Sequence, residues 1–215
     1  MMLFVLEDHN SIACQFISEL RDKSVQHDGL RFRTNLERLG SIMAYEVSKK
    51  LQYSVKAIET PLQRTEATVI KEQPVLLTIL RAGIPYFNGF QKIFDKADCG
   101  FIGAYRKEDT EELKIKLDYV ATPNLEGRDV ILIDPMLATG HSVVEALLAI
   151  KNRGYPRHLF IVCVVAAREG LTYLEENMKT AYSVWSVSVD EKLNDQLYIV
   201  PGLGDAGDLS FGKKL

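Results

Sequence analysis

Near its middle the chain reads Val130-Ile131-Leu132-Ile133-Asp134-Pro135-Met136-Leu137-Ala138-Thr139-Gly140-His141-Ser142. The apolar run at its start has the length and β-branching of a buried strand. It ends at an acid, Asp134, and a turn of small and hydroxyl-bearing residues leads into a predicted helix at 143–150. Such a turn forms an anion site, because the free N–H groups of the first helical turn and the positive end of the helix dipole face a bound phosphate.

Asp134 narrows the choice of ligand for this turn. A carboxylate beside a phosphate repels it, unless the carboxylate binds something else, such as sugar hydroxyls or a Mg²⁺ complex. The combination favours a sugar phosphate over a bare nucleoside triphosphate.

The composition is that of an ordinary globular protein with one domain. The chain has 215 residues, of which 47% are hydrophobic and 26% charged, enough for a substantial core. A net charge of −3 offers no general attraction to nucleic acid or to an anionic membrane. Any polyanionic ligand must therefore be held by a local site.

Several features favour a cytoplasmic location. Cys14, Cys99 and Cys163 are far apart and lack metal-ligand spacing, which is typical of reduced, mostly buried thiols. The first residues carry no basic leader of the kind a signal peptide has. The longest apolar run, 159–167, is too short to span a bilayer. The four histidines show no zinc spacing.

Hydrophobic periodicity predicts an α/β fold. Apolar residues at helical spacing indicate amphipathic helices around 12–20 and 36–51. Strands are expected at 55–58, 67–70, 75–80, 100–105, 130–133, 159–166 and 181–187, with an exposed hairpin in the polar segment 106–128. Continuous apolar strands that alternate with helices indicate a mainly parallel sheet covered on both faces. Residues from 194 onward are expected to form an ordered loop.

The stretch that opens at Asp134 resembles the ribose-phosphate loop of type I phosphoribosyltransferases. Its version with Asp134-Pro135 is similar to that of the uracil phosphoribosyltransferases in particular, since most other branches have two adjacent acids there. Shorter matches in the same order, such as Arg21-Asp22-Lys23 and Glu59-Thr60-Pro61-Leu62, extend the resemblance over nearly the whole chain. It implies the type I fold as a single domain over 1–215, with an N-terminal helical part at 1–54, a hood or flap at 106–128 and a uracil-binding tail at 194–215.

Two arginines lie at the ends of predicted strands, where ligands of open α/β sheets collect. Arg81 precedes Ala82-Gly83, small residues that let a ligand approach the backbone. Arg106 precedes the predicted flap. An ion pair with a neighbouring element is the alternative for Arg81, and an ordinary surface pair with Tyr105 is the alternative for Arg106. The resemblance implies that both arginines hold pyrophosphate, which suits a planar fork that binds phosphate oxygens.

The tail contains glycines 202, 204 and 207, which satisfy the pattern G-x-G-x-x-G. Too few residues follow for the helix and acid that a dinucleotide site requires, so that interpretation fails. The exposed backbone N–H and carbonyl groups of such a segment can form hydrogen bonds with a flat polar ring that carries two carbonyls and an N–H. By resemblance, the segment 198–207 is the uracil-binding segment of the family.

The resemblance implies the conversion of uracil and phosphoribosyl pyrophosphate (PRPP) to UMP and diphosphate, a pyrimidine salvage step. It implies catalytic roles for Asp134, Arg106 and Asp205. It implies PRPP contacts by Arg81, Arg106, Asp134, Pro135, Met136, Leu137, Ala138, Thr139, Gly140, His141, Ser142 and Asp205. It implies uracil contacts by Ile199, Gly204, Asp205 and Ala206. Mg²⁺ is the expected cofactor, bound through the diphosphate with no protein ligand assigned, and a homodimer or homotetramer with GTP as a candidate effector is expected.

Two alternative functions, and the roles of two residues that differ from the family pattern, remain open. One rival is a non-catalytic pyrimidine-operon regulator with this fold, and the other is an enzyme of the fold that acts on a purine or on orotate. His141 stands where the family usually has Gly or Asn, and it either points to solvent or adds charge at the 5′-phosphate. Leu209 stands where an arginine is common, which puts any subunit or effector contact of that arginine in doubt.

Overall fold

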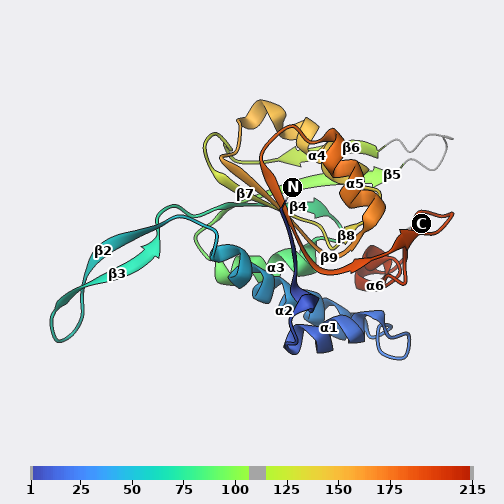
Figure 1. Cartoon of the computed structure of the whole chain (residues 1–215), viewed down its shortest axis with the longest axis horizontal. Coiled ribbons are helices and arrows are strands. Elements are labelled where there is room, and N and C mark those ends of the chain that lie inside the picture. The colour runs from blue at the N-terminus through green and yellow to red at the C-terminus, as the bar shows by residue number, and fades with distance from the viewer. Residues whose placement is uncertain (1, 107–114, 214–215) are drawn as a thin grey trace.

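A mostly parallel sheet forms the centre of the fold (Figure 1). The computed structural model describes residues 2–106 and 115–213, and side chains are described outside 104–118. The strand order is β1 (Met2–Val5), β10 (Tyr182–Asp190), β9 (His158–Ala167), β7 (Asp129–Ile133), β4 (Val75–Leu80), β5 (Asp98–Arg106) and β6 (Ile115–Ala121). All neighbours are parallel except β5 and β6, and the short β8 (Met136–Leu137) pairs with β9.

Helices cover both faces of this sheet, as the alternating pattern predicts (Figure 1). One face is covered by α1 (Ile12–Arg21), α2 (Gly29–Ser48) and α3 (Ile84–Ile93), and the other by α4 (His141–Ile150) and α5 (Arg168–Asn177). Because successive side chains of a strand point to opposite faces, Ile131 and Ile133 of β7 pack toward the first group and Val130 and Leu132 toward the second.

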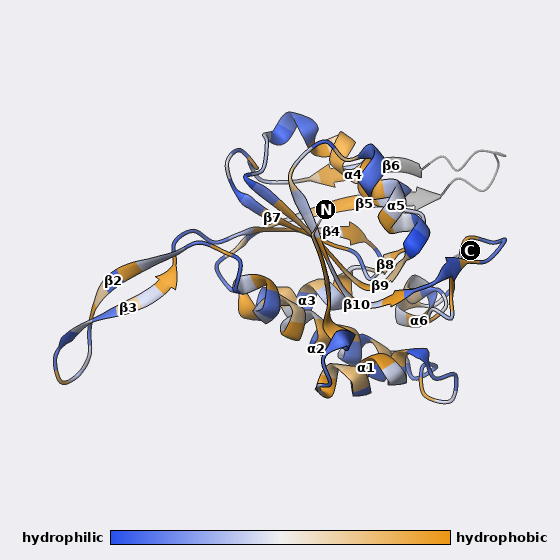
Figure 2. Ribbon diagram, viewed as in Figure 1, coloured by the Kyte–Doolittle hydropathy of each residue, from blue (hydrophilic) through white to orange (hydrophobic). Residues whose placement is uncertain are grey.

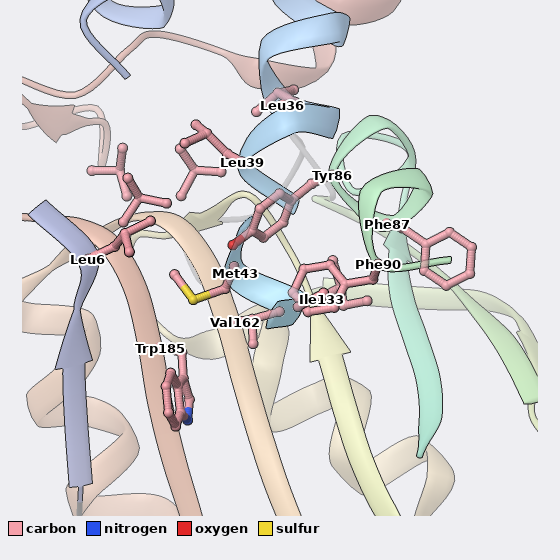
Figure 3. Close-up of a cluster of buried hydrophobic side chains, with 14 of the residues drawn as sticks. Leu6, Leu36, Leu39, Met43, Tyr86, Phe87, Phe90, Ile133, Val162 and Trp185 are labelled. Atoms are coloured by element: carbon pink, nitrogen blue, oxygen red, sulfur yellow. The ribbon is translucent and has the colours of Figure 1, made fainter. Parts of the chain in front are cut away.

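The core under α2 and α3 is the larger of the two. Figure 3 shows side chains of both helices over the strands, and its labelled residues include Leu36, Leu39, Met43, Tyr86, Phe90, Ile133, Val162 and Trp185. The two helices approach closely where Gly40 faces Gly89, and an added methyl group at Gly89 would lie 2.1 Å from the carbonyl oxygen of Glu37. Side chains cap the helix starts: Ser11 accepts a hydrogen bond at α1, and Asp28 accepts two at α2.

Smaller elements surround this body. A hairpin of β2 (Tyr53–Glu59) and β3 (Arg64–Ile70) projects away from the sheet, at the end of the molecule opposite to α6 (Ala206–Phe211) (Figure 1). Figure 2 shows hydrophobic residues along this hairpin. In the C-terminal segment, β11 (Lys192–Leu193) pairs with β12 (Ile199–Val200), and single turns of 3-10 helix lie at Leu6–Asp8 and Lys151–Arg153.

Each strand expected from the sequence is present, with small shifts in its bounds. The N-terminal part is not wholly helical, because apolar residues 2–5 add β1 to the sheet, where Phe4 packs with its ring 4.6 Å from that of Trp185. The tail is ordered as expected but contains β12 and α6 instead of a loop alone. None of the helices in the described part of the chain is long and apolar enough to cross a membrane.

Candidate active site

The strand order changes direction between β4 and β7. The chain runs from β4 outward to β5, then returns to the other side of β4 for β7, β9 and β10. Ligands of open α/β sheets bind beyond the carboxyl ends of the strands at such a point. Here those ends carry Arg81 and Asp134, and Thr78 donates a hydrogen bond to the carbonyl of Ile133 (3.1 Å), so the two ends are adjacent.

The predicted phosphate loop leads directly into α4. Gly140 caps the helix with φ of 82°, a conformation that favours glycine. The N–H groups of the first turn have no partner within the helix and can bind an anion. An added methyl group at Gly170 of α5 would lie 2.4 Å from the carbonyl oxygen of Ala138, so α5 supports the loop at close range.

His141 lies against α5. Its ring stacks on Tyr173, with the centroids 4.1 Å apart and the planes at 21°. Its Nδ1 atom is buried and has no hydrogen-bond partner among the described residues. Tyr173 thus fills the space beside the His141 ring and packs against one of its faces. His141 therefore does not simply point to solvent.

Asp134 lies at the end of β7 in a half-buried position. Burial raises the pKa of its carboxyl group to about 7, and a hydrogen bond from the N–H of Met136 (3.5 Å) opposes the rise. The backbone on both sides is fixed to β9, since Asp134 N–H donates to Val162 and the Pro135 carbonyl accepts from Val164 and Val165. A rigid carboxyl group with a raised pKa at the carboxyl ends of the strands is typical of a functional residue.

Arg81 joins the sheet to the tail. Its Nη2 atom donates to Asp208 (3.0 Å) and to the carbonyl of Gly212 (2.7 Å), whereas its buried Nε has no partner in the described part of the chain. The ion pair that was the alternative interpretation of Arg81 thus exists. It uses one of the three guanidinium nitrogens, and so it does not exclude a ligand.

The tail brings the predicted uracil residues beside Arg81. Asp205 caps α6 by accepting a hydrogen bond from Asp208 N–H (2.9 Å). An added methyl group at Gly207 would lie 3.2 Å from Oδ1 of Asp205 and 3.9 Å from Nε of Arg81. Ile199 and Ala206 are buried, and Gly204 and Asp205 are exposed. The predicted base-binding segment and Arg81 are therefore neighbours in space although they are far apart in sequence.

Two of the expected features lack a structural description. Arg106 is the last residue of β5, and its side chain lies outside the described residues, as does the middle of the flap. Among the described residues no group of three or more His, Cys, Asp or Glu could hold a metal ion. Mg²⁺ commonly uses only one or two carboxylates together with substrate phosphates, and Asp134 and Asp205 fit that requirement.

A family model for uracil phosphoribosyltransferase matches residues 6–213. A uracil phosphoribosyltransferase of Porphyromonas gingivalis is 42% identical over 207 residues, which cover 96% of both chains. The chain belongs to the uracil phosphoribosyltransferase family. This family assignment agrees with the resemblance that the phosphate loop and the tail carry.

Solved structures support the fold. The AQ2163 protein from Aquifex aeolicus superimposes with a TM-score of 0.88 at 32% identity, over 98% of each chain. A hypoxanthine-guanine phosphoribosyltransferase from Bacillus anthracis superimposes with a TM-score of 0.50 at 14% identity, over 74% of this chain and 81% of that one. The second likeness shows the fold alone, that of the type I phosphoribosyltransferases.

Two residues of the site region were not found from the sequence. Asp208 holds Arg81, and Tyr173 stacks on His141. The sequence gives no signal for the stacking, because Tyr173 lies in a helix that was not predicted. For Asp208 a signal existed, an acid three residues after Asp205 in a segment rich in glycine, but its partner depends on how the tail folds back.

Proposed function

We propose that this protein transfers a phosphoribosyl group from PRPP to uracil and releases diphosphate. The observation that carries the proposal is the convergence of three sequence segments at the switch point of the sheet. These are the loop after β7, the arginine after β4 and the tail, in which Asp208 accepts a hydrogen bond from Arg81. The family membership supports the same substrates.

In this proposal each segment binds one part of the reactants. The first-turn N–H groups of α4 hold the 5′-phosphate, and Asp134 binds ribose hydroxyls. Ionised Asp134 also favours the positive charge that develops on the ring as the bond to pyrophosphate breaks. Arg81 and Arg106 bind the departing diphosphate. Mg²⁺, bound through that diphosphate and near Asp205, neutralises charge on its oxygens.

The base is read mainly by the main chain. Backbone groups at Ile199, Gly204 and Ala206 bind the polar edge of uracil and direct N1 to the anomeric carbon. Most of the rate enhancement then comes from orientation and electrostatics. The flap at 106–128 excludes water, which would otherwise hydrolyse the sugar phosphate.

The test is a product assay with the purified protein. PRPP and Mg²⁺ are supplied with uracil, orotate, adenine, guanine or hypoxanthine in turn, and UMP from uracil is the expected result. Nucleotide formation from another base in place of uracil would favour the purine or orotate enzyme. Binding of UMP without any product from any base would favour the regulator. Addition of GTP to the same assay tests the proposed effector.

We also propose that the protein is a homo-oligomer in which the β2–β3 hairpin contacts a second copy. Isolated two-stranded hairpins are marginally stable in water, and this one exposes Val55 by 64% and Leu62 by 95%. Symmetric association of identical chains is the commonest way to cover such a surface. A molar mass above that of the 24.2 kDa chain in light scattering is expected.

A cytoplasmic location completes the proposal. All three cysteines are free thiols in the structure, and Cys163 is buried. Free thiols are typical of reducing compartments.

A further inference from the structure

The N-terminal helices hold the base-binding tail from the side of α1. Arg21, the last residue of α1, forms a bidentate ion pair with Asp190 at the end of β10. Its Nη1 and Nη2 atoms each donate to one carboxylate oxygen at 2.9 Å. Nη2 also donates to the hydroxyl of Ser188 (2.9 Å). Arg21 is 21% exposed and Asp190 6%, so this bidentate pair is largely removed from solvent.

The same pair binds both backbone groups of one residue in the tail. Gly202 donates its N–H to Asp190 (2.8 Å), and its carbonyl accepts from Nη1 of Arg21 (3.2 Å). Gly202 has a φ of 61° and is packed so tightly that an added methyl group would lie 2.1 Å from the carbonyl oxygen of Ile199. The ion pair therefore fixes the turn between Ile199 and Gly204, two of the residues proposed to read uracil.

Neighbouring contacts extend this support along the tail. Gln26, just after α1, donates to the carbonyls of Leu20 (2.9 Å) and Leu203 (3.4 Å). Arg33 of α2 donates to the carbonyl of Ser210 in α6 (2.7 Å). Three side chains from the N-terminal helical region thus bind three successive parts of the tail. The backbone carbonyls of Gly202 and Leu203 are turned toward these helices and away from a base-binding role.

We propose that the Arg21–Asp190 pair is a positioning element for base recognition. A ring that is recognised by main-chain groups requires a main chain held in one conformation. The rigid fork of arginine, which lysine cannot reproduce, supplies that restraint at Gly202. The pair touches no substrate, and it acts through the geometry of the tail. This inference rests on the proposed uracil phosphoribosyl transfer.

The test compares two arginine-to-lysine variants. Arg21→Lys keeps the positive charge but loses the fork. Arg31→Lys is the matched control, because Arg31 makes a similar fork with Glu19 (2.8 Å for each bond) that joins α2 to α1 without contact to the tail. For Arg21→Lys we expect KM for uracil to rise about tenfold, with KM for PRPP changed by less than about twofold, since Arg21 restrains the turn at Gly202 and makes no contact with Arg81 or Asp205. Arg31→Lys is expected to leave both KM values unchanged.

A second measurement distinguishes positioning from general loss of structure. The ratio of kcat/KM for uracil to that for 4-thiouracil should fall in Arg21→Lys, because a loosened set of hydrogen-bonding groups discriminates less between ring substituents. A variant that was only destabilised would lose active enzyme and keep this ratio. Ser188→Ala, which removes one acceptor of Arg21 but leaves the ion pair, should give a smaller rise in KM for uracil, about threefold.

The outcomes separate the two proposals. If the unmodified protein forms no UMP, the proposed function fails and the inference falls with it. If the unmodified protein is active and Arg21→Lys behaves like Arg31→Lys, or raises both KM values equally with an unchanged selectivity ratio, the positioning role is wrong. If Arg21→Lys does not fold, Ser188→Ala decides, and an unchanged KM for uracil in that variant overturns the inference.

Discussion

The charge of Asp134 depends strongly on its surroundings. Desolvation raises the pKa of its carboxyl group from 3.8 to about 7, so near neutral pH the group is only partly ionised. Sugar hydroxyls or a nearby Mg²⁺ stabilise the ionised form and lower this pKa again. Below the raised pKa most of the Asp134 carboxyl groups are protonated, and this fraction falls as pH rises through the pKa. If substrate binding requires the ionised form, Asp134 must therefore release a proton on binding at pH 6 to 7.

We therefore expect PRPP binding in the presence of Mg²⁺ to release about half a proton from Asp134 at pH 7, and almost none at pH 9. Calorimetric titrations in two buffers with different ionisation enthalpies measure this number. Asp134→Asn, which cannot release a proton, is the control for protons from PRPP itself. Equal release by both proteins would contradict a titrating Asp134.

Single residues of the site were predictable where a strand ended beside them. Arg81 and Asp134 were located from the apolar runs that precede them, because parallel strands place their carboxyl ends at one edge of the sheet. The contact between Arg81 and Asp208 was not predictable, since no local pattern states that a segment over 120 positions later returns to the end of β4. The Arg21–Asp190 pair could not be predicted from the sequence for the same reason.

At the scale of elements, the crossing of α2 and α3 depends on two glycines. Gly40 and Gly89 face each other, and a methyl group at either would lie within about 2.2 Å of a backbone carbonyl oxygen of the other helix. Backbone atoms cannot move aside as a flexible side chain would, so the helices must separate to admit a methyl group. The separation would open the core formed by Leu36, Tyr86 and Phe90.

We expect Gly89→Ala to lower the free energy of unfolding by about 2 to 3 kcal/mol despite the higher helix propensity of alanine. Urea unfolding followed by circular dichroism measures the change. Ile93→Ala on the same helix is the control, because Ile93 is 46% exposed and its truncation should change stability by less than about 0.5 kcal/mol. Equal stability of Gly89→Ala and the unmodified protein would show that the two helices can separate at little cost.

Elements were predictable where a long apolar pattern specified them. The runs that became β4, β7 and β9 are buried on both faces and read as continuous hydrophobic strands. By contrast β1, α6 and the pair β11–β12 have two to six residues each, too few for a period to show. Their conformation depends on what they pack against, such as β1 on Trp185 and α6 on Arg81 and Arg33.

At the scale of the whole molecule, the β2–β3 hairpin and the site lie at opposite ends (Figure 1). Register places Tyr53 opposite Ile70 and Val55 opposite Thr68, so one face of the hairpin carries apolar side chains at its base. Tyr53 is 45% exposed and Val55 64%. A second copy that covered this face would bury apolar surface without obstructing the edge of the sheet where we propose that substrates bind.

We expect Val55→Glu to reduce the molar mass in solution toward that of one chain, because a charge buried at a subunit interface without a partner is strongly unfavourable. Size-exclusion chromatography with light scattering measures the mass over a range of protein concentrations. Leu30→Glu is the matched control: Leu30 is 69% exposed but lies in the first turn of α2, where an acid is compatible with the helix dipole. Since Val55 has no role in the core of its own chain, Val55→Glu should keep the circular dichroism spectrum of the unmodified protein. An unchanged mass in Val55→Glu would exclude this face of the hairpin as a subunit contact, and a lower mass in both variants would show that the association surface extends onto α2.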